Sequence, residues 1–337
     1  MFKKITFLLL LVPIFIQAQI EPGKLGEELI IALQNTYTPV STLGYGPARD
    51  ILYSEIDNVG NDLFGIYSNF KVTLDPNEDP SISAYQNGAG INAEHVYPQS
   101  KGASSEPQKS DLHNIFPSKV SVNEARSSCE FRDIEDDDTD KWFFEATQSN
   151  STPSSNIDAY SEKDDEDCGF EPRESVKGDI ARAVFYFYTI YQSAADGADP
   201  NFFHSQKEEL YQWHLDDPVD ATEENRNNGI TDKQGNSNPF ILDVTLVQRA
   251  YFPTSSINNL ETVNWVSISS NLIEDELTIY SSKENGNVLL FNEIGQVVRS
   301  SGLQQEITMN LAGLTSGIYI LQIQSGKSSK VFRIFKK

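Results

Sequence analysis

The chain has 337 residues, which is about the length of two domains. Its 49 acidic and 26 basic residues give a formal charge of −23, and this balance excludes a protein that coats nucleic acid through long-range attraction. It leaves open an enzyme that meets a phosphodiester through a bound cation, because a metal reverses the local field. The 19 Phe, 14 Tyr and 3 Trp can fill a sizeable core.

Residues 1–18 predict a secretory signal peptide. Lys3 and Lys4 precede a largely apolar run over 5–16, and a short polar exit follows, with cleavage expected after Ala18. The run is shorter than the roughly 18 residues that a membrane-spanning helix needs, and no later stretch approaches that length. A buried N-terminal helix is the alternative interpretation.

The chain from 19 to 252 predicts a mainly helical domain. Apolar spacing indicates helices over 27–37, 48–56 and 176–191, and the last of these has the broadest apolar stripe, typical of a core helix. Period-two alternation indicates a strand over 70–74, and a second extended stretch covers 91–97. Together with the tail described next, these elements predict an α+β fold.

A change of composition over 253–262, which begins at Pro253, predicts a linker. From 263 to 337, short alternating runs separated by turns such as Asn285-Gly286 predict a small all-β sandwich. The runs that predict its strands cover 263–269, 276–280, 287–292, 306–311, 317–324 and 329–335. The segment from residue 256 onward carries seven basic and seven acidic residues. The acidic excess therefore belongs to the first domain.

The two cysteines are Cys129 and Cys168. In an exported chain they become disulfide partners more readily than metal ligands, since two thiols cannot make a four-cysteine zinc site. The segment between them contains the acidic runs 135–140 and 162–167, so we expect the bond to hold a self-repelling loop. The first run favours a solvated loop over a calcium loop, because it lacks EF-hand spacing.

Polar side chains with complementary chemistry crowd into the segment 94–126. It holds a carboxylate, imidazoles, side-chain amides and a guanidinium, which suit phosphodiester hydrolysis with one hard cation. A neutral imidazole can take a proton from water near neutral pH. Neighbours on a regular strand face opposite ways, so Glu94 and His95 are expected at a strand end or bend. Alone, this pair would be interpreted as two ordinary surface residues.

The joint pattern resembles the bacterial extracellular endonuclease I family, which has a ββα-metal (His-Me finger) nuclease core. The matching blocks, in order along the chain, lie within 94–98, 111–117, 122–127, 170–182 and 226–240. The resemblance implies a secreted, non-specific endonuclease that hydrolyses DNA, with RNA left open, and gives 5′-phosphate ends. It implies a single Mg²⁺, with Mn²⁺ or Ca²⁺ as alternative ions.

The same resemblance implies roles for individual residues. His95 is the expected general base, and Glu94 and Asn123 are the expected Mg²⁺ ligands. Arg126 follows Asn123 at i+3, so it shares a helix face with it and pairs with phosphate or holds the helix. Family members often have a basic residue just before the Glu-His pair, where this chain has Ala93. The expected supporting residues, which fix the strand and loop, are Asp111, His113 and Asn114.

The tail resembles the C-terminal sorting domain of the type IX secretion system of Bacteroidetes. The resemblance rests on residues 272–277, 295–298, 311–321 and the basic end 330–337. It implies the secretion machinery as a partner and a secreted or cell-surface location. A small Ig-like binding module is the alternative.

A hypothesis from a different class is a catalytically inactive surface binding or adhesion protein that uses the β-sandwich. The presence of Glu94, His95 and Asn123 together favours the enzyme. We expect a monomer that takes DNA, and RNA if it is accepted, as substrate.

Overall fold

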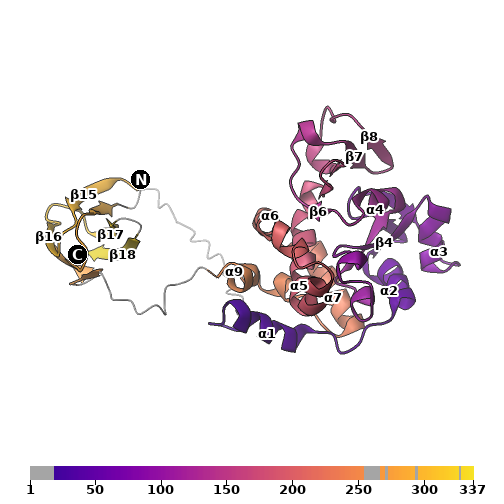
Figure 1. Ribbon diagram of the computed structural model, residues 1–337, viewed down its shortest axis with the longest axis horizontal. Coiled ribbons are helices and arrows are strands. Elements are labelled where there is room, and N and C mark those ends of the chain that lie inside the picture. Colours follow the sequence, from indigo (N-terminus) through magenta and orange to yellow (C-terminus); the bar gives the residue numbers. More distant parts are fainter. Residues whose placement is uncertain (1–18, 254–265, 270–271, 293–294, 326–327) are drawn as a thin grey trace, which may run out of the picture. The chain divides into compact units, whose positions relative to one another are not determined.

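The computed structural model describes residues 19–253, 266–269, 272–292, 295–325 and 328–337 (Figure 1). The structure forms two compact units that divide between residues 254 and 255. The predicted signal peptide lies outside the described residues, and so does most of the predicted linker. No helix in the described part of the chain has the length and apolar character that crossing a membrane requires.

The first unit is organised around a long buried helix, α5 (Lys177–Ala198), which packs on α6 (Phe202–Asp216). Figure 1 shows α5, α6 and α7 together at the centre of this unit. Ile180, Val184 and Phe185 are fully buried, so the core role predicted for this helix is confirmed. The other helices are α1 (Gly26–Tyr37), α2 (Tyr45–Ile51), α3 (Pro80–Tyr85), α4 (Val120–Arg126), α7 (Ala221–Gln234), α8 (Pro239–Leu242) and α9 (Leu246–Tyr251).

The helix predicted over 48–56 is divided in two. It begins as α2 and continues as a π-helical turn over Leu52–Ile56. The start of helix α3 has a clear local cause: Asp79 caps it by accepting a hydrogen bond from the backbone N–H of Ile82, and Pro80 occupies the first position.

A strand pair followed by a helix lies beside these elements. Strand β4 (Ile91–His95) pairs antiparallel with β5 (Ile115–Lys119), and α4 begins at the next residue. The register sets Glu94 opposite Phe116 and His95 opposite Ile115. Helix α4 contacts both strands, which completes a ββα finger. A small sheet in the order β1-β2-β3 lies next to β5 and consists of β1 (Asn58–Val59), β2 (Asp62–Phe64) and β3 (Lys71–Thr73).

The segment between the cysteines differs from the expected loop. It contributes four strands, β6 to β9, to a sheet with the order β6-β10-β9-β7-β8. The strand Ser161–Asp164 is buried although it carries the start of the second acidic run. Burial is tolerated because the carboxylates find partners: Glu162 accepts a hydrogen bond from Thr139 at 2.5 Å. The strands are β6 (Glu130–Phe131), β7 (Lys141–Phe144), β8 (Thr147–Ser149), β9 (Ser161–Asp164) and β10 (Gly169–Glu171).

The predicted disulfide is present between Cys129 and Cys168. Each cysteine directly precedes a strand, β6 and β10 respectively, and these two strands pair in parallel. The bond therefore joins the starts of two neighbouring strands. The first acidic run fits its prediction, since Asp136–Asp138 forms an exposed turn of 3-10 helix.

The second unit is a β-sandwich. Its described strands form two sheets, in the orders β11-β13-β16 and β12-β18-β17-β14-β15. Alternate residues such as Leu277, Ile279, Val288 and Leu290 form one buried core. Two of the strands, β12 and β15, were not predicted. The strands are β11 (Val266–Ile268), β12 (Leu272–Ile273), β13 (Glu276–Ser281), β14 (Asn287–Phe291), β15 (Val297–Gly302), β16 (Glu306–Asn310), β17 (Gly317–Ser325) and β18 (Ser328–Lys336).

Candidate active site

Glu94 lies near the end of β4 and is almost fully buried. Its Oε1 accepts a hydrogen bond from the Tyr67 hydroxyl at 2.7 Å and lies 3.3 Å from Nη1 of Arg126. Burial raises the pKa of Glu94, while the charge of Arg126 and the bond from Tyr67 oppose the rise. These contacts hold the carboxylate in one position and occupy Oε1.

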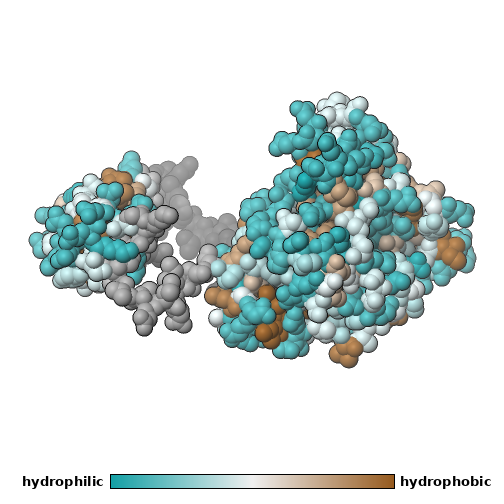
Figure 2. Space-filling view, in the orientation of Figure 1, coloured by the Kyte–Doolittle hydropathy of each residue, from teal (hydrophilic) through white to brown (hydrophobic). Residues whose placement is uncertain are grey.

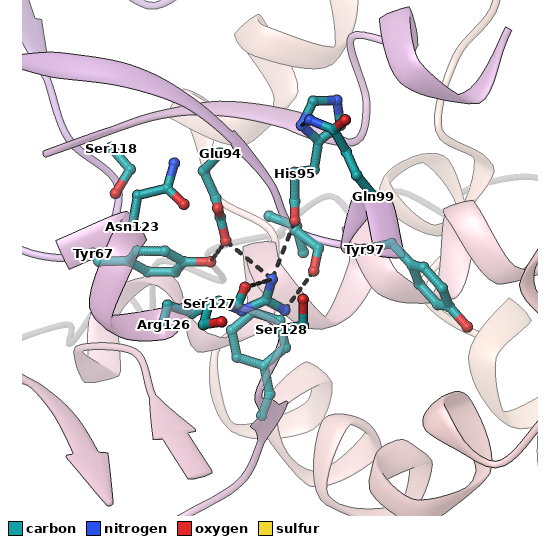
Figure 3. Close-up of polar contacts among 12 residues, drawn as sticks. Tyr67, Glu94, His95, Tyr97, Gln99, Ser118, Asn123, Arg126, Ser127 and Ser128 are labelled. Carbon is teal, nitrogen blue, oxygen red and sulfur yellow. Dashed lines mark hydrogen bonds and ion pairs between the residues drawn. The ribbon is translucent and has the colours of Figure 1, made fainter. Parts of the chain in front are cut away.

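Asn123 reaches the same region from α4. Its Nδ2 donates to Oδ1 of Asn92 at 2.8 Å and to the carbonyl oxygen of Ala93 at 3.3 Å. Because the amide nitrogen is engaged by β4, the amide oxygen is the atom that remains for another ligand. Figure 3 shows the Asn123 side chain beside that of Glu94. The finger thus brings together one carboxylate from its strand and one amide from its helix.

His95 is the last residue of β4, as a strand-end position predicts. Its Nε2 lies 2.8 Å from the carbonyl oxygen of Lys109, so we assign the ring proton to Nε2, which donates to it. Nδ1 is then the acceptor, and it lies 3.3 Å from Nε2 of the exposed residue Gln99. Burial is the largest cause that lowers the pKa of His95, and the charges of Lys109 and Arg126 lower it further. The imidazole is therefore neutral at neutral pH.

The carboxylate and the imidazole point in opposite directions. Figure 3 shows the ring of His95 next to Gln99, on the other side of the strand end from the Glu94 carboxylate. Tyr45 connects the two sides: its ring stacks on His95 with 5.6 Å between centroids. Burial raises the pKa of Tyr45, the charge of Arg49 opposes the rise, and the charge of Glu94 adds to it.

Arg126 has no exposed surface. Its Nη1 donates to the carbonyl oxygen of His95 at 3.2 Å, and its Nη2 donates to that of Val96 at 2.7 Å. The guanidinium also lies 4.4 Å from the ring centroid of Phe131. Of the two roles predicted for Arg126, these contacts fit holding the helix, and a phosphate contact is not available to a fully buried group. The contacts of Arg126 with the backbone of β4 make it a positioning residue.

Asp111 joins three parts of the first unit from a fully buried position. Its Oδ2 accepts hydrogen bonds from the hydroxyls of Tyr186 at 2.8 Å and Tyr191 at 2.7 Å, both on α5. Its Oδ1 accepts one from Nε2 of Gln234, on α7, at 2.8 Å. The turn before β5 is therefore fixed to the central helices, which is the kind of role predicted for this residue.

The other two predicted supporting residues are also buried and bonded to backbone groups. Nε2 of His113 lies 3.0 Å from the carbonyl oxygen of Asn236, and burial lowers the pKa of His113 to about 4. Asn114 binds both backbone groups of Tyr97, at 2.7 Å through Oδ1 and 3.1 Å through Nδ2. The two bonds between Asn114 and Tyr97 continue the pairing of β4 and β5 beyond the end of the strands.

The motifs did not point to Tyr67, Gln99 and Tyr45. Gln99 stands four residues after His95 in the same polar block, so its proximity could have been noticed in the sequence. Tyr45 and Arg49 stand at i and i+4, a spacing that places both on one face of α2. Tyr67 lies in a loop outside every block, and nothing in the sequence pattern marks it.

The donors at the finger fit a hard cation. A carboxylate oxygen of Glu94 and the amide oxygen of Asn123 match Mg²⁺, which binds few protein oxygens and keeps waters or phosphate oxygens. Zinc would require more nitrogen or sulfur ligands. Among the residues that the structure describes, no group of three or more His, Cys, Asp or Glu could hold a metal ion.

Comparison with known proteins gives two family matches and two extracellular relatives. Residues 25–244 match the model of the Endonuclease I family, and residues 271–337 match that of the Secretion system C-terminal sorting domain. The chain is 29% identical over 237 residues to an extracellular ribonuclease of Bacillus subtilis (strain 168), covering 65% of this chain and 72% of that protein. It is 27% identical to an extracellular ribonuclease of Bacillus amyloliquefaciens, again over 237 residues, 65% of this chain and 72% of that protein.

Likeness to solved structures is weaker. PorZ, a surface component of the type-IX secretion system of Porphyromonas gingivalis, matches with a TM-score of 0.20 and 18% identity over 26% of this chain and 13% of that chain. The sulfur carrier protein SoxY from Chlorobium limicola matches with a TM-score of 0.17 and 14% identity over 22% of this chain and 79% of that chain. Neither likeness bears on the fold.

The sorting domain and the extracellular relatives show that the protein is secreted or held at the cell surface. The family match covers the whole ββα finger, all three supporting residues and the central helices that hold them. On these grounds the chain belongs to the endonuclease I family.

Proposed function

We propose that this secreted nuclease hydrolyses phosphodiester bonds with a single Mg²⁺ and with His95 as general base, and leaves 5′-phosphate ends. The observation that carries the proposal is the end of β4. There the neutral imidazole of His95 presents an acceptor nitrogen. The side chain of the preceding residue, Glu94, lies beside that of Asn123, so that a carboxylate oxygen and an amide oxygen can both bind a cation (Figure 3).

The surroundings of His95 suit proton transfer. The Lys109 carbonyl accepts a hydrogen bond from the N–H group at Nε2 and so orients the ring. The same bond stabilises the imidazolium that forms when Nδ1 takes a proton from water. The bond from Gln99 to Nδ1 is long, at 3.3 Å, and Gln99 is exposed, so a water molecule can take its place. The water oxygen then bonds to phosphorus, and the bond from phosphorus to the 3′ oxygen breaks. The 3′ oxygen takes a proton from solvent to become a hydroxyl, and the imidazolium returns its proton to solvent.

Glu94 and Asn123 would hold the cation through Oε2 and Oδ1. When bound, the ion neutralises charge on the phosphate oxygens during the reaction. Tyr67 and Arg126 keep the carboxylate in place from the opposite side. A cation there also favours the ionised carboxylate, against the effect of burial on its pKa.

We propose both DNA and RNA as substrates. Two curated relatives are named ribonucleases, and neither ligand nor base depends on the sugar. The type IX secretion machinery is the second proposed partner, through the sorting domain. The monomeric state stays a prediction, and so does use of Mn²⁺ or Ca²⁺ in place of Mg²⁺.

The test is cutting of plasmid DNA and of RNA in Mg²⁺ and in EDTA, with Glu94→Gln beside the wild type. We expect EDTA to stop the reaction and Glu94→Gln to need a higher Mg²⁺ concentration for half-maximal rate, because one ligand charge is lost. The control is Glu124→Gln, an exposed acidic residue on the same helix as Asn123. No cutting by the wild type in Mg²⁺, Mn²⁺ or Ca²⁺ would favour the inactive binding protein.

A further inference from the structure

A groove with a volume of about 580 Å³ runs along β4 beside the candidate active site. Its walls come from α2, the π-helical turn after it, α3 and the first residues of β4. This volume lies within the range of about 300–1,000 Å³ that is typical of small-ligand sites. The side chains that matter are Tyr45, Arg49, Tyr53, Tyr85 and Asn92.

The groove touches both sides of the candidate active site. Tyr45, in its wall, stacks on His95. Asn92, also in its wall, accepts the hydrogen bond from Asn123 that orients the amide. A nucleic acid strand with its scissile phosphate at His95 would therefore extend its neighbouring nucleotide into this groove.

The lining combines aromatic rings with cations. The guanidinium of Arg49 lies 4.7 Å from the centroid of the Tyr45 ring, and Nζ of Lys109 lies 5.0 Å from it. Tyr85 is 47% exposed, so its ring is open to a ligand. Figure 2 shows a small apolar patch over α3, the helix that carries Tyr85. Stacking surfaces beside backbone-binding cations are the means by which proteins hold unpaired nucleotides.

Two donors in the groove wall lack partners. The Tyr53 hydroxyl and Nε of Arg49 are buried, and no hydrogen-bond partner for either occurs within the described ranges. Tyr53 is only 1% exposed. Buried donors are nearly always satisfied, so these two are suited to a polar ligand. The carboxylate in the wall, Asp79, is engaged as the cap of α3.

We infer that this groove is a subsite for one unpaired nucleotide next to the scissile phosphate. The base stacks on Tyr85, and the adjoining phosphate pairs with Arg49. The inference rests on the proposed function, because it places the strand at His95. The bases of a duplex stay stacked and do not enter the groove, because unstacking costs free energy, so single strands are bound and cut in preference to duplexes.

The test compares Tyr85→Ala and Arg49→Gln with the wild type on a short single-stranded oligonucleotide and on a blunt duplex of the same sequence. We expect KM for the single strand to rise about tenfold in each variant, in line with loss of one stacking or backbone contact. kcat and the duplex KM should stay within about twofold. The controls are Tyr280→Ala, which is 46% exposed in the second unit, and Lys207→Gln on α6.

Binding of the same labelled oligonucleotide in EDTA, followed by fluorescence anisotropy, separates this inference from the proposed function. Weaker binding by both variants supports the subsite even if the wild type does not cut. Equal binding and cutting by wild type and variants overturns the subsite and leaves the nuclease chemistry intact. Equal rises in KM for the single strand and the duplex also overturn the subsite. So does a wild type that does not bind the labelled oligonucleotide.

Discussion

His95 and His113 each place Nε2 next to a backbone carbonyl, at 2.8 Å and 3.0 Å. Both rings are nearly fully buried, and burial lowers the pKa of both. Their remaining surroundings differ. Nδ1 of His95 faces the amide of the exposed residue Gln99, whereas the ring of His113 packs against the buried ring of Tyr186, 4.7 Å between centroids.

The proposed base and His113 therefore share burial and a hydrogen bond to a carbonyl, so neither feature identifies a base. The role proposed for His95 requires that water reach its second nitrogen. His95 stands at the end of a strand beside an exposed loop, and His113 lies in the turn that Asp111 fixes to α5. Three experiments test this contrast and the contacts around it.

The largest expected effect comes from the two alanine variants of these histidines. His95→Ala should lower kcat/KM for nucleic acid by about 10²–10⁴, the usual contribution of a general base. His113→Ala should instead lower the free energy of unfolding by about 2–4 kcal/mol, because it leaves a cavity and an unpaired carbonyl. Initial rates and urea unfolding of both variants check this. Similar activity losses in two equally stable variants would remove the contrast.

The next effect concerns what holds the strand end in place. Arg126→Met should lower the free energy of unfolding by about 3–5 kcal/mol, because Glu94 is left as a buried charge without its partner. Thermal or urea unfolding measures it. The matched control is Arg132→Met, whose guanidinium is 37% exposed in its ion pair with Asp164, so the loss should stay within about 1 kcal/mol. Equal losses of unfolding free energy in the two variants would mean that the buried pair of Arg126 and Glu94 stabilises the fold no more than the exposed pair of Arg132 and Asp164.

The third experiment measures the response of stability to acid. Burial lowers the pKa of His113 and of His214 to about 4 in the folded chain. The unfolded chain therefore binds these protons first, and stability that is present above pH 6.5 is lost as the pH falls toward 4. The loss reaches about 3 kcal/mol for each histidine.

Urea unfolding at several values between pH 7 and pH 4 gives this slope. Protonation of carboxylates adds to it, so the informative quantity is the difference between wild type and His113→Gln. The variant should lose stability less steeply over this interval. Parallel curves would show that His113 titrates alike in the folded and unfolded chain.

Periodicity predicted much of the fold because most elements bury one regular face. Helices α1 and α5 and strands β13, β14 and β17 all lie within or over the predicted ranges. Strand β9 could not be found in this way, since Ser161–Asp164 has charged residues on both faces. Its burial depends on partners such as Thr139, which lie far away in the chain.

The sequence predicted the site residues that lie in a shared motif. It did not predict the contacts that join residues from separate segments of the chain. Glu94, His95 and Asn123 follow from their pattern. The bond from Tyr67 to Glu94 joins residues 27 positions apart through a loop, and no periodic signal marks it. The i+3 spacing of Arg126 after Asn123 defined its helix face, but it could not show that Phe131 and the backbone of β4 cover that face.

The apolar interior of each unit is assembled from its own stretch of chain. The described buried clusters of the first unit draw only on residues before 253, and that of the second unit only on residues after 265. A chain cut between the two would therefore keep each of these apolar clusters complete.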